Sequence, residues 1–151
     1  MIVGNVCKTE AVTIAAGETL SVAAHSMRER HVGLLVVVDP PQPNGDVRPI
    51  GVLTDRDIVT AAIARNADVR TLTVGDVMTR NPLLADEGHF LEVTLRFMRD
   101  LGVRRVPVVG SRGQLTGVLS FDDVLEAFAG QLTNMAGAIR NEQSRERATR
   151  S

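Results

Sequence analysis

A pattern of seven residues occurs twice in the sequence: GVLTDRD at 51–57 and GVLSFDD at 117–123. In each copy a hydroxyl residue, Thr54 or Ser120, is followed three positions later by an aspartate, Asp57 or Asp123. A hydroxyl beside the unpaired main-chain amides at the start of a helix can bind a phosphate group. A carboxylate one helical turn further on can accept hydrogen bonds from both hydroxyls of a ribose. The pattern therefore contains the groups that a nucleotide site needs.

The same residues also have a purely structural explanation. Ser/Thr-x-x-Asp ahead of an apolar run resembles a capping box, in which the hydroxyl and the carboxylate accept hydrogen bonds from free N–H groups at the helix start. The two explanations are compatible, because a carboxylate that caps a helix can still present an oxygen to a ligand. On this pattern, both remain open.

The patterns belong to a duplication that covers most of the chain. A shift of 71 residues aligns residues 3–6 (VGNV) with 74–77 (VGDV) and holds as far as Val38. From residue 51 the shift is 66, because the first copy has a longer preceding loop, rich in Pro, Asn and Gly. Such residues form turns, and such differences in length occur in exposed loops. We therefore expect repeats at 2–66 and 73–131, followed by a polar helical extension or tail at 132–151.

Each repeat is expected to fold as strand, helix, strand, strand, helix. Apolar residues at helical spacing predict helices over 20–27 and 91–98, and further helices should begin at Asp57 and Asp123. Continuous β-branched runs predict strands that are buried on both faces. The expected strands lie near 12–14, 34–38 and 50–54, and near 83–85, 106–109 and 115–120. One repeat would bury too little surface alone, so the predicted fold is α/β, with two repeats packed about a pseudo-twofold axis.

The composition excludes several classes of protein. The 151 residues carry 17 Lys and Arg against 18 Asp and Glu, with no Trp or Tyr, so the charge and the aromatic side chains of a nucleic-acid binder are missing. The longest apolar run, residues 32–38, is far too short to span a bilayer. The amino terminus lacks the pattern of a secretory signal. We therefore expect a cytoplasmic protein without nucleic-acid or membrane partners.

Residues that bind metals or act as nucleophiles form no recognisable set. Cys7 is the single cysteine, which excludes a disulfide framework; we expect it to be inert, with redox sensing as the alternative. His25, His31 and His89 lack the spacing of metal ligands. No Ser/His/Asp or Cys/His set and no glycine-rich phosphate loop is apparent. An enzyme is therefore the least favoured class, and neither a metal nor a catalytic cofactor is expected.

Two further stretches are characteristic of a known family: VMTRNP at 77–82 and VRRVPVV at 103–109. Over residues 2 to about 130, the chain resembles a pair of CBS domains forming one Bateman module, as in small bacterial proteins that contain little else. The resemblance implies adenosine-containing ligands, such as AMP, ATP, NAD or S-adenosylmethionine, in clefts between the repeats. It implies that Thr54 and Asp57 belong to one site and that Ser120 and Asp123 belong to the other. Each aspartate would hold the ribose, each hydroxyl would lie near the phosphates, and apolar strands would enclose the adenine.

The second copy departs from the first where residues 121–122 are FD instead of the DR of 55–56. The extra carboxylate would repel a phosphate, whereas Arg56 in the first copy could attract one. Arg104 and Arg105, on a strand that we expect to border the second cleft, could compensate there. If each phosphate-binding site is formed by its own repeat, we expect the first cleft to bind a nucleotide more strongly. Phosphate contacts from Arg104 and Arg105 in the second cleft would reverse that order.

The leading functional hypothesis is a non-enzymatic sensor that binds an adenine nucleotide, such as AMP, ATP or NAD, and acts on an unknown protein effector. The alternative is a structural or interaction protein in which the patterns only cap helices. Helices at 58–64 and 124–129 are apolar nearly all round, and CBS pairs commonly dimerise through these helices, so we expect a homodimer. The polar tail at 133–151 is expected to be a frayed helix or a disordered end, with a contact inside the dimer as the alternative.

Overall fold

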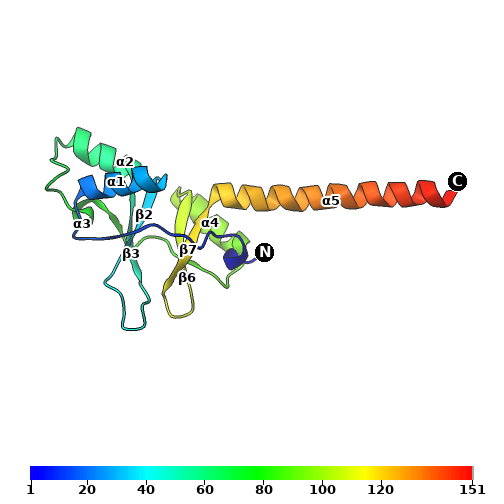
Figure 1. Cartoon of the computed structure of the whole chain (residues 1–151), viewed down its shortest axis with the longest axis horizontal. Coiled ribbons are helices and arrows are strands. Elements are labelled where there is room, and N and C mark those ends of the chain that lie inside the picture. Colours follow the sequence, from blue (N-terminus) through cyan, green and yellow to red (C-terminus); the bar gives the residue numbers. More distant parts are fainter. Residues whose placement is uncertain (151) are drawn as a thin grey trace.

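The computed structural model describes residues 1–150, in which each repeat forms a small sheet covered by helices (Figure 1). After a 3-10 turn, η1 (Val3–Asn5), the first repeat contains β1 (Thr13–Ala15), α1 (Leu20–Arg30), β2 (Leu34–Val38), β3 (Pro49–Thr54), α2 (Asp55–Val59) and a π-helix, η2 (Thr60–Ala64). The second contains α3 (Val74–Val77), β4 (Thr79–Arg80), β5 (Ala85–Asp86), α4 (Leu91–Leu101), β6 (Arg105–Val109), β7 (Leu115–Ser120) and α5 (Phe121–Arg150).

The two sheets repeat one topology. In the first, β1 pairs in parallel with β2, and β2 pairs antiparallel with β3. In the second, β5 pairs in parallel with β6, and β6 pairs antiparallel with β7. The expected α/β class and the duplicated order of elements are therefore confirmed.

Several boundaries differ from those expected, and two of the differences recur in both repeats. The first strand of each repeat begins one or two residues later, at Thr13 and Ala85, because its extent is set by pairing with the neighbouring strand rather than by the local apolar run. The helices that follow the repeated patterns begin at Asp55 and Phe121, two residues before the aspartates. The preceding hydroxyl residue is the helix cap, so the aspartate lies inside the first turn.

Each sheet receives a segment from the other repeat. Lys8 forms a bridge with Val118 of β7, so the start of the chain lies on the second sheet. The equivalent segment of the second repeat, β4, pairs with β3 in the first sheet. The expected repeat boundaries follow the repeated sequence pattern. In the structure, the first segment of each repeat, which we call its leading segment, packs on the sheet of the other repeat.

The glycine of each repeated pattern is required by this exchange. A Cβ at Gly51 would lie 2.6 Å from Sδ of Met78 and 2.9 Å from the carbonyl oxygen of Thr79. A Cβ at Gly117 would overlap the carbonyl oxygen of Lys8. Only glycine lets the exchanged segment approach the strand so closely.

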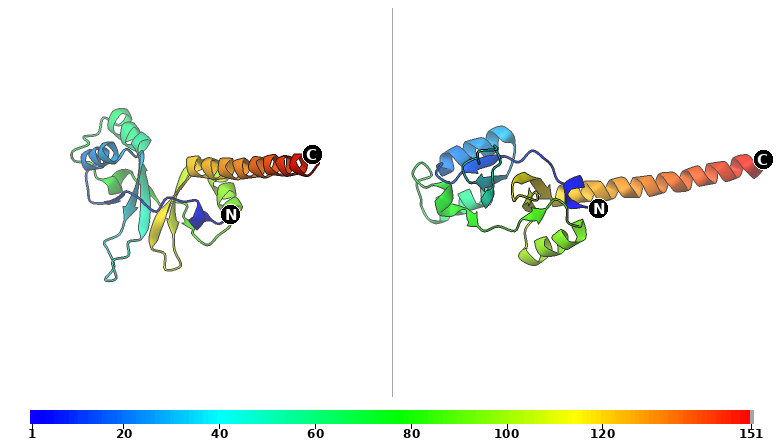
Figure 2. Two further views of the ribbon diagram at one scale, coloured as in Figure 1. Left: turned by 45° about the vertical axis from the view of Figure 1, so that its right-hand side comes forward. Right: turned by 90° about the horizontal axis from the view of Figure 1, so that it is seen from below.

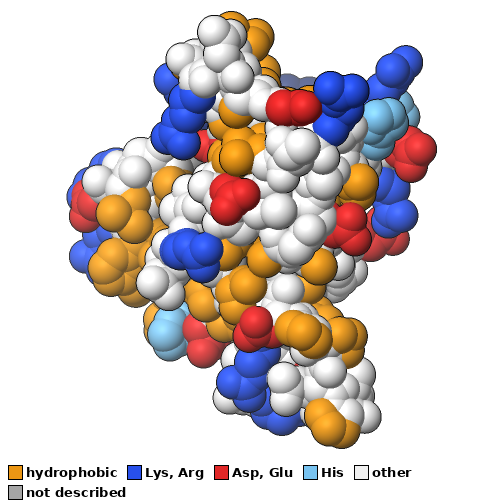
Figure 3. Space-filling view, turned by 90° about the vertical axis from the view of Figure 1, so that its left-hand side faces the viewer, with side chains coloured by type: hydrophobic (Ala, Val, Ile, Leu, Met, Phe, Trp, Pro, Cys, Tyr) orange, Lys and Arg blue, Asp and Glu red, His pale blue; other side chains and the backbone are white. Residues whose placement is uncertain are grey.

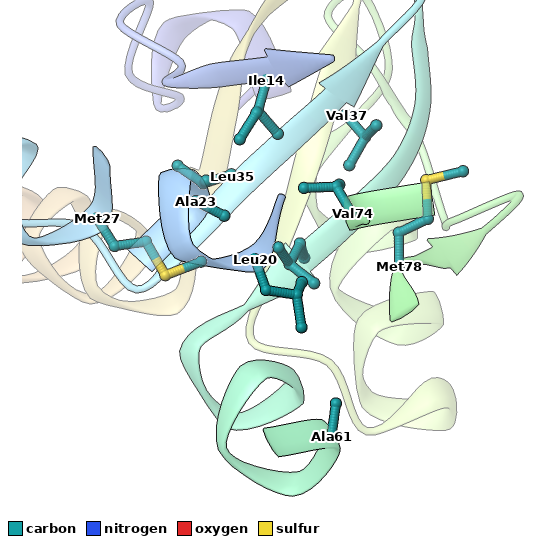
Figure 4. Packing of buried hydrophobic residues seen from close by; sticks show 10 residues of the cluster. Ile14, Leu20, Ala23, Met27, Leu35, Val37, Ala61, Val74 and Met78 are labelled. Carbon is teal, nitrogen blue, oxygen red and sulfur yellow. The ribbon is translucent and has the colours of Figure 1, made fainter. Parts of the chain in front are cut away.

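The exchanged segments also complete the two hydrophobic cores. Val74 and Met78 pack among residues of the first repeat, including Leu20 and Leu35 (Figure 4). Val3 is fully buried in the second core. Within β2, the residues Leu35, Val36 and Val37 are fully buried, which confirms that the strand is covered on both faces. Each core therefore depends on chain from both repeats.

The last helix, α5, is one continuous helix of 30 residues, and most of it projects away from the two sheets (Figures 1 and 2). Of the alternatives expected for the tail, the structure has the helical extension; Ser151 lies outside the described residues. Although α5 is long, neither it nor another helix of residues 1–150 is apolar enough to cross a membrane.

Candidate functional site

The larger cleft lies between the repeats and contains the first repeated pattern. It has a volume of about 670 Å³, and we name it the Asp57 cleft. Its walls come from the starts of β2 and β6, from the turn between β3 and α2, and from the segment around β4. The apolar side chains among them include Leu34, Val52, Pro82 and Val103. The volume lies within the 300–1,000 Å³ that small-molecule sites usually have.

The second repeated pattern lies in a smaller cleft, of about 230 Å³, which we name the Asp123 cleft. Its walls come from residues 8–12, residues 31–34 and the turn between β7 and α5. These segments are the equivalents, in the other repeat, of those that form the Asp57 cleft. The pseudo-symmetric pair is thus unequal in size, and the Asp123 cleft falls below the usual range for a ligand site.

In the Asp57 cleft the pattern forms a complete capping box. The Thr54 hydroxyl accepts a hydrogen bond from the main-chain N–H of Asp57 at 3.1 Å, and Asp57 Oδ2 accepts one from the N–H of Thr54 at 2.9 Å. The capping explanation is therefore confirmed for this copy. Among residues 1–150, no group donates to Asp57 Oδ1, which remains available to a ligand in the cleft.

In the Asp123 cleft both carboxylate oxygens are already engaged. The Ser120 hydroxyl donates to Asp123 Oδ2 at 2.5 Å, and Lys8 Nζ lies 3.0 Å from Oδ1. Burial by itself would raise the pKa of Asp123, but the hydrogen bonds from Ser120 and Lys8 outweigh it and lower the pKa. The hydrogen bond with Asp123 raises the pKa of Lys8 in turn. A ribose at Asp123 would have to displace the lysine.

The structure corrects the expected position of the two arginines. Arg104 lines the Asp57 cleft rather than the second one, and Arg105 borders both clefts. The reason is the pseudo-twofold arrangement, which turns the start of each central strand toward the pattern of the other repeat. Arg56 lies in the Asp57 cleft, as expected from its own repeat.

The two clefts consequently differ in charge. The Asp57 cleft contains three arginines and two carboxylates: Arg56, Arg104 and Arg105 with Asp55 and Asp57. The Asp123 cleft contains two cations and three carboxylates: Lys8 and Arg105 with Glu10, Asp122 and Asp123. Clefts concentrate the field of their lining charges, so an anionic phosphate is favoured in the Asp57 cleft and disfavoured in the other.

Lys8 is one of the cleft residues that sequence reasoning missed. The shift of 71 pairs Lys8 with Thr79, which shows that the first repeat begins atypically. That comparison could not show that Lys8 reaches Asp123, because the two residues meet only through the exchange of leading segments. Thr79 occupies the equivalent place in the Asp57 cleft and carries no charge to compete for Asp57.

Cys7 does not line either cleft, and the histidines form no metal-binding cluster among residues 1–150. Burial, and next the charge of Glu87, raise the pKa of the Cys7 thiol, which disfavours the reactive thiolate. Across residues 1–150, no three His, Cys, Asp or Glu side chains gather as metal ligands do. His31 lines the Asp123 cleft as a single histidine.

Replacing Lys8 by methionine should destabilise the protein near neutral pH, because it removes the cation that pairs with the buried Asp123 carboxylate. Because the pKa of Asp123 is lowered in the folded protein, its ionised carboxylate stabilises the fold at pH values above the ordinary 3.8, and this contribution is lost as the pH falls through the folded-state pKa. Because the pKa of Lys8 is raised, its charge stabilises the fold at pH values below the ordinary 10.5, and this contribution is lost as the pH rises through the folded-state pKa. Urea midpoints of both proteins should therefore differ between these limits and converge at either end. A difference that stayed constant across this pH range would show that Lys8 acts by packing, not by charge.

The chain belongs to the CBS domain family, whose model matches residues 3–64 and 74–130. The two matches in tandem confirm the resemblance to a CBS pair that the motifs indicated.

Known proteins agree with this assignment. Hypoxic response protein 1 of Mycobacterium tuberculosis is 36% identical over 107 residues, which cover 71% of each chain. An uncharacterized protein of Methanopyrus kandleri is 29% identical over 82% of this chain, which spans only 61% of that protein. The solved structure of a CBS domain protein from Pyrobaculum aerophilum complexed with AMP has a TM-score of 0.72 and 27% identity, covering 82% of this chain and 89% of that one.

Proposed function

We propose that this protein is a non-enzymatic regulatory module that binds an adenosine-containing nucleotide, such as AMP, ATP or NAD, in the Asp57 cleft. The observation that carries the proposal is the unengaged Asp57 Oδ1 in a 670 Å³ cleft that three arginines line. Asp57 would accept hydrogen bonds from the ribose. Thr54 and the arginines would hold the phosphates, because guanidinium groups suit phosphate oxygens. The adenine would lie between apolar side chains such as Leu34 and Val52.

The AMP complex of the P. aerophilum relative supports this class of ligand. Ser120 and Asp123 would form the weaker site, since the cleft around them is small and Lys8 competes for the carboxylate.

A nucleotide in the Asp57 cleft would contact both repeats, because Thr54 comes from the first and Arg104 from the second. Its binding would therefore favour one arrangement of the repeats over others. A ligand can shift such an equilibrium only by its different affinities for the two states. This difference is what an effector protein would detect.

Titration calorimetry with AMP, ATP and NAD should show one of them binding once per chain. The same nucleotide should raise the melting midpoint. At a concentration of a hundred times its Kd, it should increase the free energy of unfolding by about 2.7 kcal/mol. Adenosine without phosphate should bind more weakly if the arginines contribute as proposed. If folded protein gives neither heat nor a higher midpoint with any of the three nucleotides, the alternative holds, in which the patterns only cap helices.

We also infer that the protein is a homodimer. Val59 and Ile63, on the helix after β3, are 54% and 73% exposed, and Leu125 and Phe128 of α5 are 66% and 40% exposed. Figure 3 shows that apolar side chains reach the surface in several places among polar and charged ones on the end of the molecule where the first repeat lies. Exposed apolar patches of this kind mark contacts with other proteins, and a second copy is the partner that CBS pairs commonly use.

A further inference from the structure

The α5 helix carries a regular stripe of large apolar side chains: Phe121, Leu125, Phe128, Leu132, Met135 and Ile139. Their spacing alternates between four and three residues, which is the repeat of a coiled coil. Phe121 packs against the second core, but the other five are between 40% and 67% exposed. The family match ends at residue 130, so the second half of the stripe lies beyond the CBS pair.

The chain itself leaves this stripe uncovered. The views of Figures 1 and 2 agree that most of α5 extends away from both sheets, and Leu132, Met135 and Ile139 are 67%, 64% and 56% exposed. The extension also contains Gly130 and Gly137, which weaken an isolated helix. A helix of this kind draws its stability from packing its apolar face rather than from intrinsic propensity. The projecting half of α5 therefore needs a partner to stay folded.

We propose that the partner is α5 of a second copy, paired with it in antiparallel orientation; this rests on the homodimer proposed above, to which Leu125 and Phe128 already contribute. In this arrangement the stripe is self-complementary. Leu125 would face the partner's Met135 and Phe128 the partner's Leu132, while Phe121 stays in the second core of its own chain. The residues that flank the stripe in its middle are small or uncharged, which permits close approach: Ala129, Gln131, Ala136 and Ala138. Every layer of the seam is thus apolar.

The charges along α5 select the antiparallel direction. The first half, 121–135, has three carboxylates and no cation, whereas the second half, 136–150, has four arginines and two glutamates. A parallel pair would bring like charges together at both ends. An antiparallel pair places the basic half of each helix, from Arg140 onward, toward the acidic start of the partner's helix. The carboxylates exposed there are Asp122 and Glu126, since Asp123 is buried and already paired with Lys8. Opposed helix dipoles favour the same direction.

Substituting Leu132 in the centre of the stripe tests the pairing. Light scattering at micromolar concentration should give wild type twice the mass of one 16.3 kDa chain. Leu132→Glu should weaken self-association at least tenfold and reduce the helix content seen by circular dichroism. The matched control is Asn134→Glu, which adds the same charge to an exposed position outside the stripe and should still dimerise. Unchanged self-association of Leu132→Glu overturns the proposal.

That outcome remains distinct from failure of the other proposals. A Leu132→Glu protein that dimerises as strongly as wild type would still be a dimer, formed through another surface such as Val59 and Ile63. The nucleotide titrations do not depend on α5 at all.

The direction is tested by spin labels on Ser144→Cys, in a Cys7→Ser background that is confirmed as folded by its melting curve. With a rise of 1.5 Å per residue and the seam centred between Phe128 and Leu132, antiparallel labels should lie roughly 40 Å apart. Parallel helices would bring the labels within about 20 Å, since paired helix axes are 8–10 Å apart. A short distance therefore overturns the antiparallel pairing.

Discussion

Replacing Asp57 by alanine is expected to weaken nucleotide binding by roughly tenfold to a hundredfold. The ribose would lose hydrogen bonds to a charged group, and such bonds contribute about 1.5–3 kcal/mol. Titration calorimetry of the variant with the nucleotide that wild type binds measures the loss. Because Asp57 also caps α2, the variant should melt at a somewhat lower temperature.

A second capping box in the chain separates these two effects. Thr73 and Asp76 form the same pair of hydrogen bonds at the start of α3, at 3.3 Å and 3.0 Å, and Asp76 does not line either cleft. Asp76→Ala should therefore lower the melting midpoint as Asp57→Ala does, yet bind nucleotide as wild type does. If folded Asp57→Ala binds every nucleotide unchanged, Asp57 is only a helix cap and the site assignment fails.

The same titration ranks the two clefts. Asp123→Ala should change nucleotide affinity less than Asp57→Ala, because Lys8 and Ser120 already engage the Asp123 carboxylate. The structure removes the reason for expecting the reverse order, since Arg104 lies in the Asp57 cleft. A larger loss in Asp123→Ala would show that Lys8 yields to the ligand and that the smaller cleft opens on binding.

Gly117→Ala is expected to destabilise the protein by about 2–3 kcal/mol, as overpacking in a tight site does. The added methyl group would overlap the carbonyl oxygen of Lys8, which belongs to the main chain and cannot move as a side chain could. The two hydrogen bonds between Lys8 and Val118 hold the segment there, at 2.9 and 3.0 Å. Thermal or urea unfolding measures the change.

Gly130→Ala is the matched control for that substitution. Gly130 lies within α5, and a Cβ there would meet nothing within 4 Å. Alanine is favoured over glycine inside a helix by roughly 0.5–1 kcal/mol, so this variant should be at least as stable as wild type. Equal melting of Gly117→Ala and wild type would mean that the leading segment is not held against β7.

Local features of the fold could be predicted from the sequence. The duplication follows from aligning the sequence with itself at shifts of 71 and 66 residues. The α/β class and the buried strand β2 follow from residue types at short spacing, since apolar periodicity reports which faces of an element are covered. The capping box at Thr54 and Asp57 is equally local, because both partners lie within one helical turn. These features depend on neighbours in the chain, which the sequence displays directly.

Contacts between distant residues were decided by the tertiary structure. The exchange of leading segments brings Lys8 to Asp123, and the pseudo-twofold packing turns Arg104 into the Asp57 cleft. These two contacts decide which of the two clefts suits a phosphate. The chain could not display them as a pattern, because the partners lie far apart in sequence and meet only where two cores are completed by each other's segments. The electrostatic interaction of a charged side chain is strong only with groups within a few ångströms. The groups around Lys8 and Arg104 come that close only once the two repeats have packed together.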